Sequence, residues 1–158
     1  MMKNYLPVLI ISFFTFFSLR SFSQSPVVEW KFSAGKRSGN EYIVSAKAVI
    51  QKDWKLFSTS MKDDEPNSRI NLDSSSSAAV LEIKESNNLK KAREPLFDNA
   101  EIRYFENQAE FTLHISADKA GKEIKGRVNY MAIKGSEVVG PEEVPFRFSF
   151  DPSGNLVA

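Results

Sequence analysis

Side chains that could carry out chemistry are few in this 158-residue sequence. Cysteine is absent, which excludes thiol exchange, disulfide bonds and thiolate ligands to zinc. The single histidine, His114, has no second histidine to help it hold a metal. It lies on the polar face of an alternating segment, so we interpret it as a surface residue. The sequence therefore predicts neither a metal nor another cofactor.

Carboxylates are the remaining candidates. Asp63, Asp64 and Glu65 could supply oxygen ligands to calcium, but they lack the spacing and the glycine of a calcium loop, which favours a solvated loop. Glu142 and Glu143 could serve glycoside hydrolysis, but neighbours on a strand point to opposite faces. A carboxylate-dependent hydrolase stays an alternative only if acids from separate strands converge. No phosphate loop or nucleophile motif is present.

Charge and aromatic residues narrow the class of partner. The net charge of +1 creates no long-range field to attract nucleic acid or an anionic membrane, so we expect neither as a partner. Trp54 could be a stacking platform for a sugar, but a core tryptophan of a sandwich is the favoured interpretation. A carbohydrate- or ligand-binding sandwich is the alternative function, and it would require an exposed Trp30 or Trp54.

The N-terminal 23 residues have the layout of a secretory signal peptide. Lys3 precedes an apolar run over residues 6–19, and small residues at Ser21 and Ser23 suit a signal peptidase. The apolar run is shorter than the roughly 20 residues that a membrane-spanning helix requires. We predict a signal peptide at residues 1–23, no membrane span after its cleavage, and a periplasmic or secreted, stand-alone domain at residues 24–158.

The positions of the candidate residues depend on strands, because apolar side chains recur with a period of two. Such alternation is typical of half-buried strands, and turn residues separate about nine of them. We expect a hairpin turn at residues 105–108 and a long crossing loop at residues 84–99, where Pro95 limits any helix. Many short strands with regular turns predict an all-β, antiparallel sandwich. The expected strands cover residues 27–34, 41–50, 54–59, 69–72, 78–84, 100–105, 109–117, 126–133 and 143–150.

Four stretches resemble, in order, one known family. They are KDWKLFS at residues 52–58, PNSRINL at 66–72, EPLFDNAEIRYFENQAEFT at 94–112 and YMAIKGSEVVGPEEVPFRF at 130–148. The chain is similar over residues 27–150 to the N-terminal periplasmic domain of the thiol:disulfide interchange protein DsbD. The resemblance implies an immunoglobulin-like fold and a pathway that passes reducing equivalents to periplasmic proteins.

The departures from that family fall at its active site. Its two cysteines would stand at Ile133 and Val138, and its aromatic cap would fall at Leu96 and Phe97. The resemblance therefore implies a redox-inactive relative without catalytic residues or enzyme activity. We predict a docking surface at these four residues for a periplasmic protein partner, with a thioredoxin-like protein as the candidate. The alternative, that Ile133 and Val138 only fill the former pocket, stays open.

Overall fold

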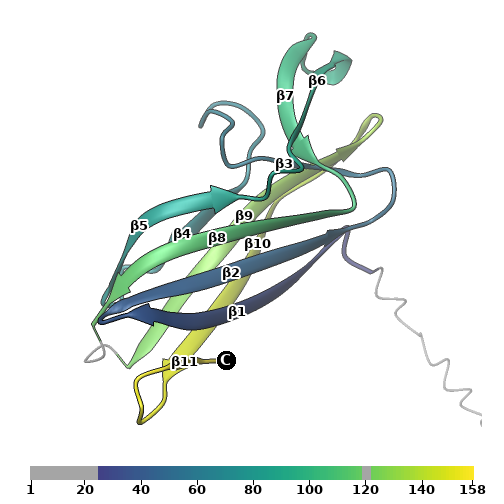
Figure 1. Cartoon of the computed structure of the whole chain (residues 1–158). Coiled ribbons are helices and arrows are strands. Elements are labelled where there is room, and N and C mark those ends of the chain that lie inside the picture. The colour runs from purple at the N-terminus through teal and green to yellow at the C-terminus, as the bar shows by residue number, and fades with distance from the viewer. Residues whose placement is uncertain (1–24, 119–121) are drawn as a thin grey trace, which may run out of the picture.

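The computed structural model describes residues 25–118 and 122–158. The segments in which apolar and polar residues alternate are strands of two antiparallel sheets, and the apolar faces of the two sheets pack against each other (Figure 1). The predicted signal peptide lies outside the described residues. The first sheet has the strand order β1, β2, β8, β5. These strands are β1 (Val28–Ser38), β2 (Glu41–Ile50), β8 (Gln108–Ala117) and β5 (Ala78–Glu85).

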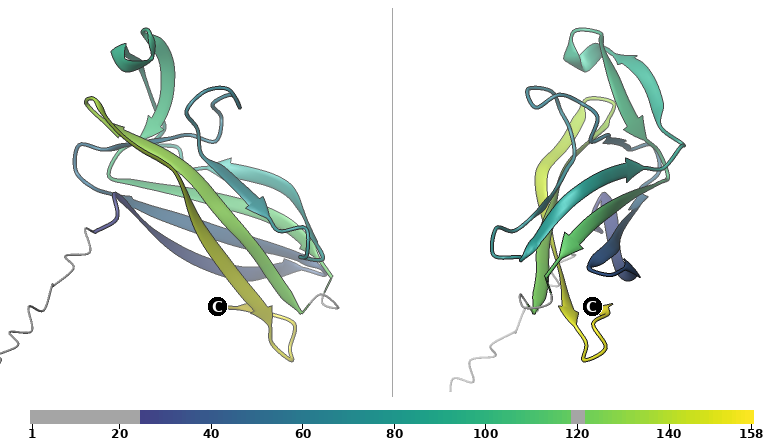
Figure 2. Two further views of the ribbon diagram at one scale, coloured as in Figure 1. Left: turned by 180° about the vertical axis from the view of Figure 1, so that it is seen from behind. Right: turned by 60° about the vertical axis from the view of Figure 1, so that its left-hand side comes forward.

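The second sheet packs across the first and contains the β9–β10 and β6–β7 hairpins. Its order is β11, β10, β9, β3, β7, β6, and β4 pairs with β9 beside this path. Figure 2 shows the β6–β7 hairpin rising from one end of the sandwich. The strands are β3 (Lys55–Phe57), β4 (Arg69–Leu72), β6 (Lys90–Glu94), β7 (Ala100–Phe105), β9 (Glu123–Lys134), β10 (Glu137–Phe150) and β11 (Leu156–Val157). Within the described residues no helix is long and apolar enough to cross a membrane.

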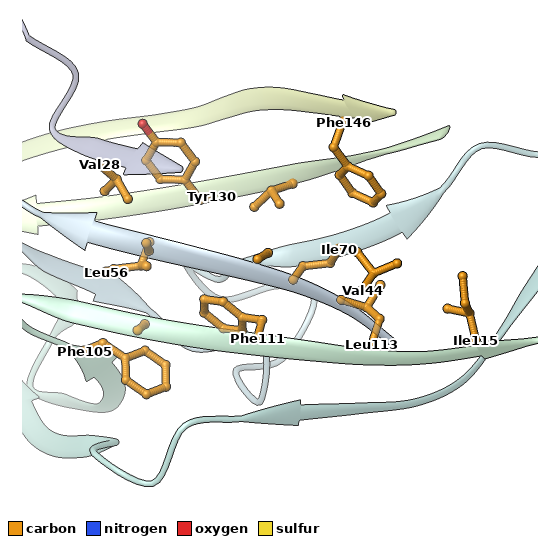
Figure 3. Packing of buried hydrophobic residues seen from close by; sticks show 14 of the residues in the cluster. Val28, Val44, Leu56, Ile70, Phe105, Phe111, Leu113, Ile115, Tyr130 and Phe146 are labelled. Atoms are coloured by element: carbon orange, nitrogen blue, oxygen red, sulfur yellow. The ribbon is translucent and has the colours of Figure 1, made fainter. Parts of the chain in front are cut away.

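The main core lies between the sheets, and Figure 3 shows its side chains converging from both. On β2 the alternation is complete, because Tyr42, Val44 and Ala46 are fully buried while Lys47 points to solvent. Burying one such large apolar side chain contributes roughly 1.5–3 kcal/mol. Trp54 is 6% exposed and belongs to this core, as the sequence predicted.

One predicted connection is confirmed in part and another is wrong. Residues 84–99 do cross from the first sheet to the second, but they are not a loop throughout, because they contain the end of β5, the whole of β6 and the 3-10 turn η1 (Pro95–Phe97). The hairpin turn expected at residues 105–108 does not join paired strands, because β7 belongs to the second sheet and β8 to the first. The chain therefore crosses between the layers there, within two residues of the end of β7.

Candidate functional site

The tip of the β9–β10 hairpin brings together Ile133 and Val138, the two positions at which the resemblance would place cysteines. Gly135, with φ of +57°, and Ser136 form the turn, and Lys134 pairs with Glu137 on either side of it. Ile133 and Val138 are the next pair, directly opposite each other and therefore on the same face of the sheet. Ile133 is 1% exposed, whereas Val138 is 45% exposed.

Ile133 is buried in a second, smaller cluster on the far side of the second sheet. Leu56 and Ala132 belong to the main core, so their neighbours Phe57 and Ile133 point to the opposite face. We call this group the outer cluster. Its buried members are Phe57, Met61, Ile102, Tyr104 and Ile133, and Ala92, Phe97 and Met131 pack against it.

A short cap covers part of the outer cluster. The 3-10 turn η1 begins at Pro95 and ends at Phe97, and Asp98 and Asn99 then adopt left-handed φ values of 52° and 58° that return the chain to β7. The ring of Phe97 meets that of Phe57 edge-on, with centroids 5.9 Å apart. Leu96, one residue earlier, points outward and is 42% exposed.

A half-buried ion pair fastens the start of this cap to β3. Lys55 Nζ donates a hydrogen bond of 3.0 Å to Glu94 Oε2, with side chains 28% and 11% exposed. The same ammonium lies 5.2 Å from the centroid of the Tyr104 ring. Lys55 is also paired with Ile133 across β3 and β9. No motif in the sequence marks this pair, because only the folded arrangement of β3 and the start of the cap brings the two charges together.

The four residues singled out from the sequence therefore divide into two kinds. Phe97 and Ile133 belong to the outer cluster, whereas Leu96 and Val138 are exposed beside it. Of Ile133 and Val138, only Ile133 is buried, so the alternative that these residues fill a pocket can apply to Ile133 alone. Whether the exposed pair binds anything stays a prediction.

The other candidates lie elsewhere. His114 lies on the outer face of the first sheet, where its Nε2 is 2.9 Å from Glu41 Oε2 and Arg37 Nη1 lies 2.9 Å from the same nitrogen. In the described part of the chain, no three His, Asp or Glu side chains gather as a metal site would require. Asp63 forms an ion pair of 2.6 Å with Arg69.

An open pocket of about 500 Å³ beside β9, β10 and β11 holds two carboxylates, Glu123 and Asp151. A hydrogen bond from Lys125 lowers the pKa of Glu123, and hydrogen bonds from Asn155 lower the pKa of Asp151. A glycosidase needs one carboxylic acid with a raised pKa to protonate the leaving group. Both carboxyl pKa values in this pocket are lowered, so neither Glu123 nor Asp151 has the raised pKa that this role needs.

The tryptophans do not form the exposed platform that a carbohydrate-binding alternative requires. Trp54 is buried in the main core. Trp30 is half-buried on β1, where its ring packs against Phe111 and Tyr130 at centroid distances of 5.7 Å each. Neither ring is therefore free to stack on a sugar with its whole face.

Comparison with known proteins supports the fold. No protein-family model matches the chain, and no curated protein matches it. Among solved structures, the N-terminal periplasmic domain of ScsB from Proteus mirabilis is similar, with a TM-score of 0.53 and 10% sequence identity over 85% of this chain. The chain spans about half of that structure's length, 55%. At this identity the likeness concerns the fold alone, and it confirms the predicted all-β, immunoglobulin-like antiparallel sandwich.

Proposed function

We propose that this chain is a non-catalytic protein-binding module of the periplasm or the secreted space, and that its partner is a thioredoxin-like protein. The observation that carries the proposal is the exposure of Leu96 and Val138 beside the outer cluster, to which the half-buried Phe97 and the buried Ile133 belong. Because the chain has no cysteine, the module has no thiol with which to exchange electrons. Docking is the part of the family's role that these residues can still perform.

The energetics favour a contact at this end of the sandwich. Exposed leucine and valine side chains gain roughly 25 cal/mol for each Å² of apolar surface that a partner removes from water. Leu96 follows a proline and precedes the anchored Phe97, and Val138 lies in a paired strand, so both side chains are held on ordered backbone. Little conformational freedom is then lost on binding, which leaves more of the gain as affinity.

Two observations support the location. Residues 1–23 have the layout of a signal peptide. The similar solved structure is described as a periplasmic domain. A module exported in this way would meet the disulfide-exchange proteins of the cell envelope.

The test is capture with matched variants. The purified protein is immobilised, an envelope extract from its own source is passed over it, and retained proteins are identified by mass spectrometry. Val138→Lys places a charge in the proposed contact. Val157→Lys is the control, because Val157 is also 45% exposed but lies on β11, at the other end of the sandwich (Figure 1).

We expect a thioredoxin-like protein to be retained by the unchanged chain and by Val157→Lys, and to be lost with Val138→Lys. The captured protein is then purified and titrated against each variant by calorimetry. Equal retention by Val138→Lys and the unchanged chain would contradict the docking surface. Retention of no thioredoxin-like protein by any variant would contradict the partner class.

A further inference from the structure

The free edge of the first sheet is an interaction surface that the proposed function does not use. β5 is the outermost strand of that sheet and pairs with β8 on one side only within the described residues. Residues 79–84 are all exposed, in a strand of eight residues. They include Val80 at 39%, Leu81 at 53% and Ile83 at 37% exposure. An exposed apolar edge strand is a template for pairing with another strand.

The long strand β10, which in the second sheet is covered by β11 only at residues 149–150, is protected against such pairing. β10 carries Pro141 and Pro145, which have no N–H to donate, and its register shifts between Val139 and Glu142. β5 contains no proline. Its own irregularity falls between Val80 and Glu82, so Leu81 is bulged and the stretch from Glu82 onward keeps a regular ladder with β8.

The exposed side chains of β5 include two that face the core side of the sheet. Val80 pairs with Ile115 and Ile83 pairs with Leu113, and both partners are fully buried. Val80 and Ile83 are nevertheless more than a third exposed, because the second sheet does not cover this flank. A further strand beside β5 would extend the sheet and shield both side chains from water.

The charges on β5 favour one occupant, which is β5 of a second copy. Glu82 and Lys84 lie on the outer face, two residues apart, and their side chains meet at 3.2 Å within one chain. If two β5 strands pair antiparallel about Ile83, each Glu82 stands opposite the other copy's Lys84. A shift that centres the pair on Glu82 places two glutamates face to face, and centring on Lys84 places two lysines face to face. Opposite charges directly across a ladder stabilise it, and like charges destabilise it.

We propose that the chain forms a two-fold symmetric dimer through β5, in which the first sheets of two copies join into one continuous antiparallel sheet. The contact is isologous, since the same strand is offered by both copies. Glu85 limits its length, because that carboxylate accepts hydrogen bonds from Thr59 N at 2.6 Å and from Ser58 Oγ at 2.7 Å, which places residues 58–59 beside the end of β5. The pairing therefore centres on residues 82–84.

The test is sedimentation velocity of the purified protein over a range of concentrations, with variants that address the charges. Lys84→Glu replaces each attractive cross-copy pair with two facing glutamates. The double variant Glu82→Lys with Lys84→Glu restores opposite charges in the reverse order. Since two symmetric pairs change together, we expect Lys84→Glu to raise the dimer dissociation constant by about tenfold, and the double variant to reverse most of that loss.

Ile83→Lys is a second, independent variant, because it places two lysines together at the two-fold axis. We expect a monomer at every concentration, with far-ultraviolet circular dichroism unchanged because Ile83 is partly exposed. A dimer that persists in Ile83→Lys would overturn the proposal, as would a monomeric unchanged chain at the highest concentration. Binding of a foreign extended peptide at β5 by a monomeric chain would also overturn it.

Discussion

Val138 stands directly opposite Ile133 across the β9–β10 hairpin, yet Val138 is 45% exposed and Ile133 only 1%. The difference follows from the order of the strands. At Ile133, β9 is flanked by β10 and by β3, whereas β11 reaches β10 only at residues 149–150, so Val138 lies at an edge of the described sheet. The outer cluster therefore buries Ile133, whereas Val138 stays exposed to solvent.

This pairing predicts that cysteines at both positions will form a disulfide. Directly opposed residues of antiparallel strands have Cα atoms about 4.5–5.5 Å apart, within the range of about 4.4–6.8 Å that a disulfide needs. We expect the variant carrying Ile133→Cys and Val138→Cys to lose both free thiols on mild oxidation, as a thiol-reactive dye would report. The pair Ala132→Cys with Val138→Cys is the control, because Ala132 faces Val139 instead. Free thiols in the first variant would contradict the observed register.

Truncation of the same two residues should separate a structural role from a surface role. Ile133→Ala leaves a cavity beside Phe57 and Tyr104, and we expect it to lower the free energy of unfolding by about 2–5 kcal/mol. Val138→Ala should cost less than about 1 kcal/mol, because the side chain is nearly half exposed. Urea denaturation measures both values. Similar costs for the two variants would mean that the cap does not close over Ile133.

How much of this could be predicted from the sequence depends on which interactions decide each feature. The strands with complete alternation, such as residues 41–50 and 109–117, were predicted because burial on one face imposes a period of two. β6 was missed because its sequence, KKARE, has no such period. It is an exposed edge strand, and it is held by its backbone pairing with β7, not by burial of one face.

The errors at the connections have a physical cause as well. Residues 105–108 carry ordinary turn chemistry, and Asn107 adopts a positive φ of 64°. Such residues report that the chain reverses, but not whether the next strand stays in the same sheet. The candidate site stays a prediction. The resemblance singled out Ile133, Val138, Leu96 and Phe97, but which of them is buried depends on where the cap folds, and local sequence does not determine that.

A matched pair of charge removals would test the ion pair that anchors the cap. Lys55→Met leaves Glu94, which is 8% exposed as a residue, without its cation. Removing one partner of a buried pair leaves an uncompensated charge, so we expect Lys55→Met to speed hydrogen exchange in β6 and η1. The double variant with Glu94→Gln should recover part of that protection, because no charge is then left unpaired. Exchange unchanged in Lys55→Met would show that the pair does not hold the cap.

Tyr130 provides a prediction for alkaline pH. Burial raises the pKa of its phenol, and the nearby carboxylate of Glu142 raises it further. Because the pKa of Tyr130 is higher in the folded than in the unfolded chain, the protonated phenol contributes fully to stability below about pH 10. This contribution is lost as the pH rises through the pKa of the folded state. The absorbance of tyrosinate, taken as the difference between the chain and its Tyr130→Phe variant, gives the midpoint.

We expect that midpoint to lie above 10 and to fall part of the way in Glu142→Gln, since burial, the larger cause, is unchanged. The residue is well placed for this effect, because Glu142 pairs with Tyr130 across the hairpin. A midpoint at or below about 10 would contradict the burial of this ring.

Gly126 should be a strand glycine at which even a methyl side chain is unfavourable. It lies in β9 with Leu72 of β4 on one side and Phe146 of β10 on the other. A Cβ at this position would overlap the Phe146 ring and the carbonyl oxygen of Asn71. We expect Gly126→Ala to lower the free energy of unfolding by about 1–3 kcal/mol, because the ring and the β4 backbone must both move.

Gly35 is the matched control for that substitution. It is also a strand glycine, in β1, but nothing lies within 4 Å of the place its Cβ would occupy and its φ is not in the left-handed region. Gly35→Ala should change stability by no more than about 0.5 kcal/mol, and a small gain is expected because alanine restricts the unfolded chain. Urea denaturation of the two variants side by side makes the comparison. Equally small effects of the two substitutions would show that Phe146 does not pack over Gly126. The spacing of β4, β9 and β10 in the structure would then also be wrong.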